Sequence, residues 1–166
     1  MAILIGFPIL SGMLVFQSAV MSRIPLLHGT TDLVLLAVVA WALQKRVKTA
    51  WHWSIMAGLL VTAVSALPFG VAILGYPLAA AFALALRQRV WQVPILAMFA
   101  ATFAGTLITQ AISLVALRMV GNPLPWQQAI NLIILPSLLL NLLVAIPVYA
   151  LLGDLAGWLY PEELEV

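Results

Sequence analysis

The side chains that could take part in catalysis are few and lie far apart in the sequence. Asp32 is the only acidic residue before Asp154, and His28 lies close to it. One histidine and one carboxylate do not make a metal site, and a catalytic dyad would also need a nucleophile or a positioned substrate group. The chain has no cysteine, and it contains no P-loop, nucleotide-binding fingerprint or metalloprotease motif. The sequence therefore predicts a protein that is not an enzyme and that holds no metal or cofactor.

Asp32 has a simpler role available at the start of a helix. Thr30, Thr31 and Asp32 directly precede an apolar run that begins at Leu33. Such polar residues are preferred before the first turn of a helix. The helix dipole also favours a carboxylate at this position. We therefore expect Asp32 to cap the helix that begins here.

Other polar side chains interrupt segments that are otherwise apolar. Gln17 lies late in the first of these segments and Asn141 lies in the last. A further set recurs at three- and four-residue spacing and so shares one face of a helix: Thr106, Thr109, Gln110 and Ser113. Two interpretations are open. The side chains could form hydrogen bonds between helices, each worth less than about 1–2 kcal/mol, or they could line a polar cavity or a partner contact.

Small residues form a stripe on the same segment. Ala97, Ala101 and Gly105 repeat at a spacing of four residues, which lets two helices approach closely. The stripe could serve packing within the protein or contact with an external partner.

The composition places all of these residues in a membrane protein. The chain is 65% hydrophobic and only 7% charged, whereas a soluble domain has roughly 25% charged residues. The length of 166 residues suits one compact helical bundle. The net charge of +2 argues against nucleic acid as a partner, because basic loops beside membrane segments explain it better.

Apolar runs of about 20 residues are long enough to cross a bilayer. The run that begins at Leu33 is short, and a re-entrant hairpin is the alternative there. The turn signal Pro68-Phe69-Gly70 separates two spans, because a single bent helix would be nearly twice a membrane thickness. We expect an all-α integral membrane protein, a six-helix transmembrane bundle forming one domain over residues 1–166. The expected spans cover about residues 3–21, 31–45, 53–67, 70–86, 93–117 and 128–152.

Basic residues fix the expected orientation. Five of the seven occupy the second and fourth loops, and the positive-inside rule makes those loops cytoplasmic. Both termini are then cytoplasmic, Asp32 lies near the outer interface, and the protein resides in the plasma or inner membrane. Five tryptophans fall near the cytoplasmic interface and Trp126 near the outer one, as expected for an aromatic belt. The basic loop residues are Lys45, Arg46, Lys48, Arg87 and Arg89, and the five tryptophans are Trp41, Trp51, Trp53, Trp91 and Trp158.

Short motifs along the whole chain resemble those of the rod shape-determining MreD family. The resemblance lies in Phe16-Gln17-Ser18 of the first span and in Thr31-Asp32-Leu33-Val34-Leu35-Leu36 at the start of the second. A central glycine-rich hairpin and the last span also resemble that family. Their motifs are Gly58-Leu59-Leu60, Pro68-Phe69-Gly70 and Gly75-Tyr76, then Leu135-Pro136-Ser137-Leu138-Leu139-Leu140-Asn141 and Ile146-Pro147.

The resemblance implies a non-enzymatic membrane scaffold of the bacterial cell-elongation (rod shape) machinery, the elongasome. Such a protein binds the transmembrane helix and juxtamembrane segment of MreC and helps to regulate peptidoglycan synthesis and cell shape. The glycosyltransferase RodA and a class B penicillin-binding protein belong to the larger complex, and MreB is contacted indirectly. The basic loops would contact anionic lipid headgroups or the cytoplasmic shape machinery.

The family is similar in fold to the substrate-binding subunits of energy-coupling-factor vitamin transporters, so a vitamin-binding subunit is the alternative. A vitamin subunit would present a longer, polar first outer loop and a pocket rich in hydrogen-bonding side chains. The corresponding loop here covers only Ser22 to Thr30 and holds one charge. The scaffold is therefore the favoured prediction.

Overall fold

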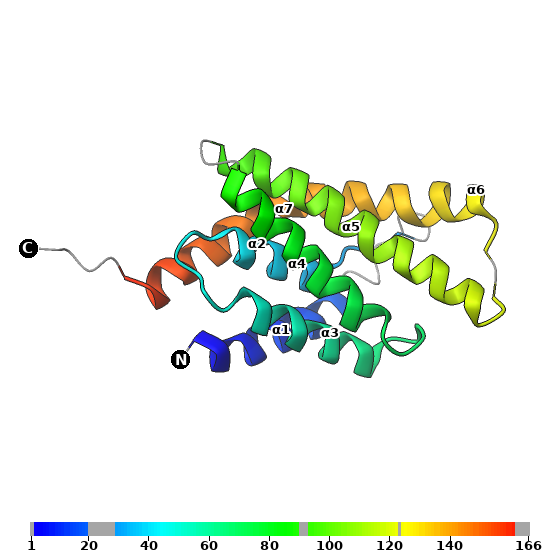
Figure 1. The fold of residues 1–166 in the computed structure, drawn as a ribbon, viewed down its shortest axis with the longest axis horizontal. Coiled ribbons are helices and arrows are strands. Elements are labelled where there is room, and N and C mark those ends of the chain that lie inside the picture. The colour runs from blue at the N-terminus through cyan, green and yellow to red at the C-terminus, as the bar shows by residue number, and fades with distance from the viewer. Residues whose placement is uncertain (1, 20–28, 90–92, 123, 162–166) are drawn as a thin grey trace, which may run out of the picture.

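The computed structural model describes residues 2–19, 29–89, 93–122 and 124–161, and its regular elements are helical (Figure 1). The helices pack side by side, with α1 beginning and α7 ending at the same end of the molecule. Their bounds are α1 (Ala2–Ala19), α2 (Leu33–Leu43), α3 (Ala50–Val64), α4 (Val71–Arg89), α5 (Pro94–Met119), α6 (Trp126–Gln128), η2 (Ala129–Ile134) and α7 (Leu135–Leu159).

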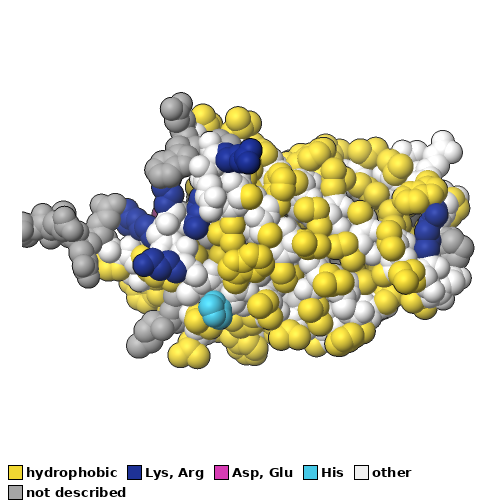
Figure 2. Space-filling model, viewed as in Figure 1, with side chains coloured by type: hydrophobic (Ala, Val, Ile, Leu, Met, Phe, Trp, Pro, Cys, Tyr) yellow, Lys and Arg dark blue, Asp and Glu magenta, His cyan; other side chains and the backbone are white. Residues whose placement is uncertain are grey.

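Three helical segments within the described chain are long and apolar enough to cross a membrane. They are Val71–Arg89, Pro94–Met119 and the continuous run Trp126–Leu159, and three shorter apolar helices accompany them. The outer surface is itself apolar: Leu4 is 74% exposed and Leu143 is 76% exposed. Figure 2 shows apolar side chains over the middle of the molecule and basic side chains gathered near one end. These features are those of a membrane protein.

Helix α2 lies at the centre of the bundle. It contacts α1, α3, α4, α5 and α7, and all of its 11 residues are buried. A helix that is apolar on every side is stable only when other apolar groups surround it. With 11 residues, it is four residues shorter than the expected span over residues 31–45, or about 6 Å at 1.5 Å per residue. Because neighbouring helices enclose α2, its length does not have to match the thickness of the membrane.

Two of the tryptophans expected at the interface belong instead to the core. Trp41 and Trp53 are fully buried, and their rings stack with centroids 4.2 Å apart. Gly6 of α1 packs on Trp53, since a Cβ at Gly6 would lie 2.7 Å from the indole Nε1. The prediction was wrong for these two because hydropathy does not distinguish a side chain facing lipid from one facing another helix. Trp51 and Trp158 are exposed, and Trp91 lies outside the described residues.

The small-residue stripe on α5 faces the interior. Ala101 is fully buried and Ala97 nearly so. A Cβ at Gly105 would lie 3.3 Å from the Cβ of Ala79 on α4 and 3.5 Å from a methyl of Val39 on α2. Packing within the protein therefore accounts for the stripe.

The last helical run differs in length and regularity from the expected span over residues 128–152. It continues to Leu159 and contains the π-helical turn η2, which ends two residues before Pro136. A proline inside a helix removes one backbone donor and clashes with the preceding turn, and a wider π turn absorbs such a mismatch. Earlier in the chain, α3 and α4 are separate helices joined through Gly70, whose φ of +96° suits glycine.

Candidate functional site: a buried polar network around Asp32

Backbone N–H groups at the entry to α2 donate to side chains of other helices, while the carbonyl of Asp32 accepts the first helical hydrogen bond, from the Leu36 N–H. The Thr30 N–H donates to Ser137 Oγ at 3.1 Å. The Asp32 N–H donates to Asn141 Oδ1 at 2.8 Å. The Leu33 N–H donates to Gln17 Oε1 at 2.7 Å. Backbone N–H groups at the start of a helix lack acceptors within the helix, and unpaired N–H groups are costly inside a membrane. Side chains of α1 and α7 therefore provide the acceptors for this segment.

The carboxylate of Asp32 caps α2. Its Oδ1 accepts a hydrogen bond from the Leu35 N–H at 2.9 Å. The hydroxyl of Tyr76 on α4 donates to the same carboxylate, with its oxygen 2.8 Å from Oδ2 and 3.0 Å from Oδ1. The capping geometry is the one expected from the sequence. The side chain is half-buried among the helices that pack around it.

Asn141 joins this segment to α5. Its side chain is 1% exposed, and its Nδ2 donates to Thr106 Oγ1 at 2.9 Å. The amide oxygen of the same residue accepts the Asp32 N–H. Asn141 therefore uses its donor and its acceptor at once, and the network connects α1, α2, α4, α5 and α7.

A polar cavity of about 240 Å³ adjoins the network. The polar face of α5 turns towards it, and two of these side chains also bond to the backbone of their own helix: Thr109 Oγ1 to Gly105 O, and Ser113 Oγ to Thr109 O. The hydrogen-bonding residues that line the cavity are Gln17, Thr30, Asp32, Ser65, Tyr76, Thr106, Thr109, Gln110, Ser113 and Asn141.

The chemistry that this cavity offers is hydrogen bonding. Asp32 is the only carboxylic side chain among the described residues that line it, and both of its oxygens already accept hydrogen bonds. Among the described residues, no group of three or more histidine, cysteine, aspartate or glutamate side chains could hold a metal ion. His28 lies outside the described residues.

Sequence reasoning identified Gln17, Asp32, Gln110 and Asn141 and missed two members of the network. In the sequence, Tyr76 stands out only as part of a Gly-Tyr motif, and Ser137 only within the Leu-Pro-Ser motif. The sequence does indicate a role for Tyr76. A tyrosine hydroxyl within an apolar segment needs a polar partner, and Asp32 is the carboxylate closest to Tyr76 along this chain, which has few acidic residues.

The expected basic loops lie together at one end of the molecule, called the basic end below (Figure 2). Arg87 has a structural role there, because its Nη1 donates to Gln44 O at 2.8 Å and to Val47 O at 3.1 Å. Arg46 Nη1 donates to Tyr160 O at 3.3 Å. Lys45, Lys48 and Arg89 have exposed side chains. The opposite end carries Arg118, whose guanidinium lies 4.0 Å from the ring centre of Trp126.

No family model matches the chain, and no curated protein or solved structure matches it either. Proposals about its function therefore depend on its own residues and contacts.

Proposed function

We propose that this protein is a non-enzymatic scaffold of the MreD type, which crosses the plasma or inner membrane six times with both termini in the cytoplasm. In this role it binds MreC within the cell-elongation machinery. Through MreC it influences RodA, a class B penicillin-binding protein and, indirectly, MreB.

The observation that carries this proposal is the meeting of the family-like motifs in space. Gln17, Asp32, Tyr76 and Asn141 come from four separate motifs of the resemblance, yet each makes a hydrogen bond within one network. A fifth motif residue, Gly58, lies against the backbone of α4, where a Cβ would come within 2.9 Å of Ile73 Cα. Motifs that are weak one by one thus specify a single arrangement of helices, which supports a shared architecture.

An apolar groove between α1 and α7 is our proposed site for the MreC transmembrane helix. Its volume is about 440 Å³. Gly12 lines it, and a Cβ placed there would meet no atom within 4 Å. Small residues allow close helix contacts in membranes. The groove is lined by Pro8, Ile9, Gly12, Met13, Phe16, Leu33, Val144, Pro147, Val148 and Leu151.

Substitution of Gly12 tests this site. We expect Gly12→Leu to fill the groove without disturbing the fold and to weaken association by about 1–2 kcal/mol, or about 5- to 30-fold. The measurement is the amount of MreC from the same organism that co-purifies with each variant.

The matched control is Gly157→Leu, because Gly157 also has open space around its missing Cβ but does not line the groove. Equal recovery of MreC with both variants would remove the groove from the proposal. Failure of the unsubstituted protein to associate with MreC would overturn the scaffold itself.

A vitamin-binding subunit remains the second candidate, and the polar cavity beside Asp32 is the observation that favours it. Its volume of about 240 Å³ is below the roughly 300–1,000 Å³ of most ligand pockets. Its carboxylate is also already engaged by Tyr76 and the first turn of α2. Both facts favour the scaffold. Mass spectrometry of the purified protein decides between the two, because a co-purifying vitamin would support the transporter subunit.

A further inference from the structure

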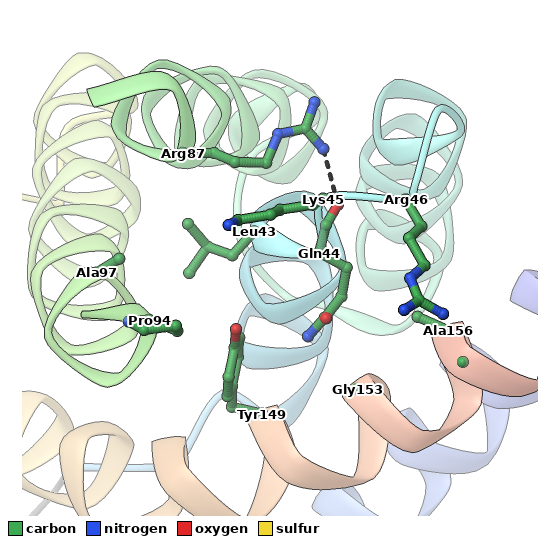
Figure 3. A pocket seen from close by; sticks show the side chains of 11 residues that line it. Leu43, Gln44, Lys45, Arg46, Arg87, Pro94, Ala97, Tyr149, Gly153 and Ala156 are labelled. Carbon is green, nitrogen blue, oxygen red and sulfur yellow. Dashed lines mark hydrogen bonds between the residues drawn. The ribbon is translucent and has the colours of Figure 1, made fainter. Parts of the chain in front are cut away.

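A second cavity lies at the basic end, between the end of α2, the last turn of α4, the first turn of α5 and the last part of α7. Its volume is about 350 Å³. Figure 3 shows Lys45, Gln44 and Tyr149 extending into the space between these helices. Its lining residues are Leu43, Gln44, Lys45, Arg46, Arg87, Pro94, Ala97, Tyr149, Gly153, Ala156 and Gly157.

The described charged side chains that line this cavity are all basic. Lys45, Arg46 and Arg87 line it, and no aspartate or glutamate is among its described lining residues. The two hydrogen bonds from Arg87 to Gln44 O and Val47 O both use Nη1, and a guanidinium carries further N–H donors on Nε and Nη2. The carbonyl oxygens after α2 are thereby occupied, which limits their repulsion of an anion.

Neutral groups add hydrogen-bonding capacity. Gln44 Nε2 is buried and makes no hydrogen bond of good geometry in the described part of the chain, although its side chain interacts with the hydroxyl of Tyr149. A buried donor of this kind is costly unless a ligand or water accepts from it. The cavity is open beside Gln44 Nε2 because Gly153 has no side chain. A Cβ on Gly153 would lie 3.6 Å from Gln44 Nε2. The N-terminal end of α5, at Pro94 and Ala97, also favours negative charge.

We infer that this cavity binds a phosphate group, supplied either by the headgroup of an anionic phospholipid or by soluble phosphate. Basic pockets between membrane helices hold the headgroups of cardiolipin and related lipids. Arginine and lysine donors match phosphate oxygens. The inference does not depend on MreC, because it rests on a different end of the molecule from the α1–α7 groove.

The test uses the full-length protein purified in detergent, with cardiolipin, phosphatidylglycerol, phosphatidylcholine and sodium phosphate added separately. Native mass spectrometry measures retained lipid, and thermal unfolding measures stabilisation. We expect both anionic lipids to bind and phosphatidylcholine not to bind. Stabilisation by sodium phosphate, with competition against the lipids, would identify soluble phosphate as the ligand and still support the site. Equal binding of phosphatidylcholine, or no binding of any anion, would overturn the inference.

Gly157→Leu should fill the cavity, since a Cβ at Gly157 meets no atom within 4 Å, and weaken binding by about tenfold. Ala100→Leu is its control, because Ala100 is exposed on α5 and does not line the cavity, and it should bind like the unsubstituted protein. Should Gly157→Leu fail to fold, Lys45→Gln should weaken binding by about fivefold, and Arg89→Gln, which removes an equal charge outside the cavity, should not. Equal weakening by Lys45→Gln and Arg89→Gln would reduce the effect to general surface charge and overturn the site.

Discussion

At the scale of single residues, Asn141 is the side chain on which the polar network depends most. It accepts from the backbone of the α2 entry segment and donates to α5. A carboxamide is suited to this position because it carries an acceptor and donors on one planar group. No apolar residue of similar size would satisfy both neighbours.

Replacement of Asn141 should therefore be costly. We expect Asn141→Leu to leave the Asp32 N–H and the Thr106 hydroxyl without partners and to lower the free energy of unfolding by about 1–3 kcal/mol. Thermal unfolding in detergent measures the change. Asn131→Leu is the matched control, because the Asn131 side chain is exposed and should tolerate an apolar residue. Equal loss of stability in both variants would contradict the role given to Asn141.

At the scale of the helix, close packing of α5 on α2 and α4 determines how the polar network is held. Ala101 lies in the middle of the small-residue stripe and is fully buried. Interfaces of this kind transmit any added volume directly to the neighbouring backbone, because packed interiors contain few voids.

Enlarging the stripe should separate these helices. We expect Ala101→Leu to destabilise the protein by about 1–3 kcal/mol through overpacking, measured as a lower melting temperature in detergent. Ala100→Leu should be near neutral, since Ala100 is exposed on the same helix. An unchanged melting temperature for Ala101→Leu would show that the contact is loose.

The positions of the helices along the chain could be predicted from the sequence, whereas the burial of each helix within the bundle could not. Runs of apolar residues located all the long helices, and the polar residues before Leu33 identified the cap at Asp32. The same apolarity gave no sign that α2 is enclosed on every side, or that Trp41 and Trp53 stack inside the core. In a membrane protein both lipid and protein neighbours are apolar, so hydropathy reports no difference between them. The partners of Gln17 and Asn141 were equally hidden, because they are backbone groups of a distant segment.

At the scale of the whole molecule, charge divides the protein into two ends. Five basic residues lie at the basic end, where α1 begins and α7 ends. Arg118 lies at the opposite end. The positive-inside rule then predicts which end faces the cytoplasm.

The absence of cysteine from the sequence makes this orientation simple to measure. Single substitutions Lys48→Cys and Asn122→Cys place one thiol at each end on exposed residues. We expect a membrane-impermeant maleimide added to intact cells to label Asn122→Cys and not Lys48→Cys. Lysed cells, in which both should react, provide the control. Labelling of Lys48→Cys from outside would reverse the proposed topology.

The enclosed position of α2 has a consequence for how the chain is made. The backbone N–H groups of its entry segment donate hydrogen bonds to Ser137 and Asn141, which belong to α7, the last helix of the described chain. Until α7 has been inserted, the donors of Thr30 and Asp32 lack these two partners. The core of the bundle is therefore completed only after α7 has been inserted, and a chain truncated before Leu135 would carry an incomplete core that quality-control proteases can recognise.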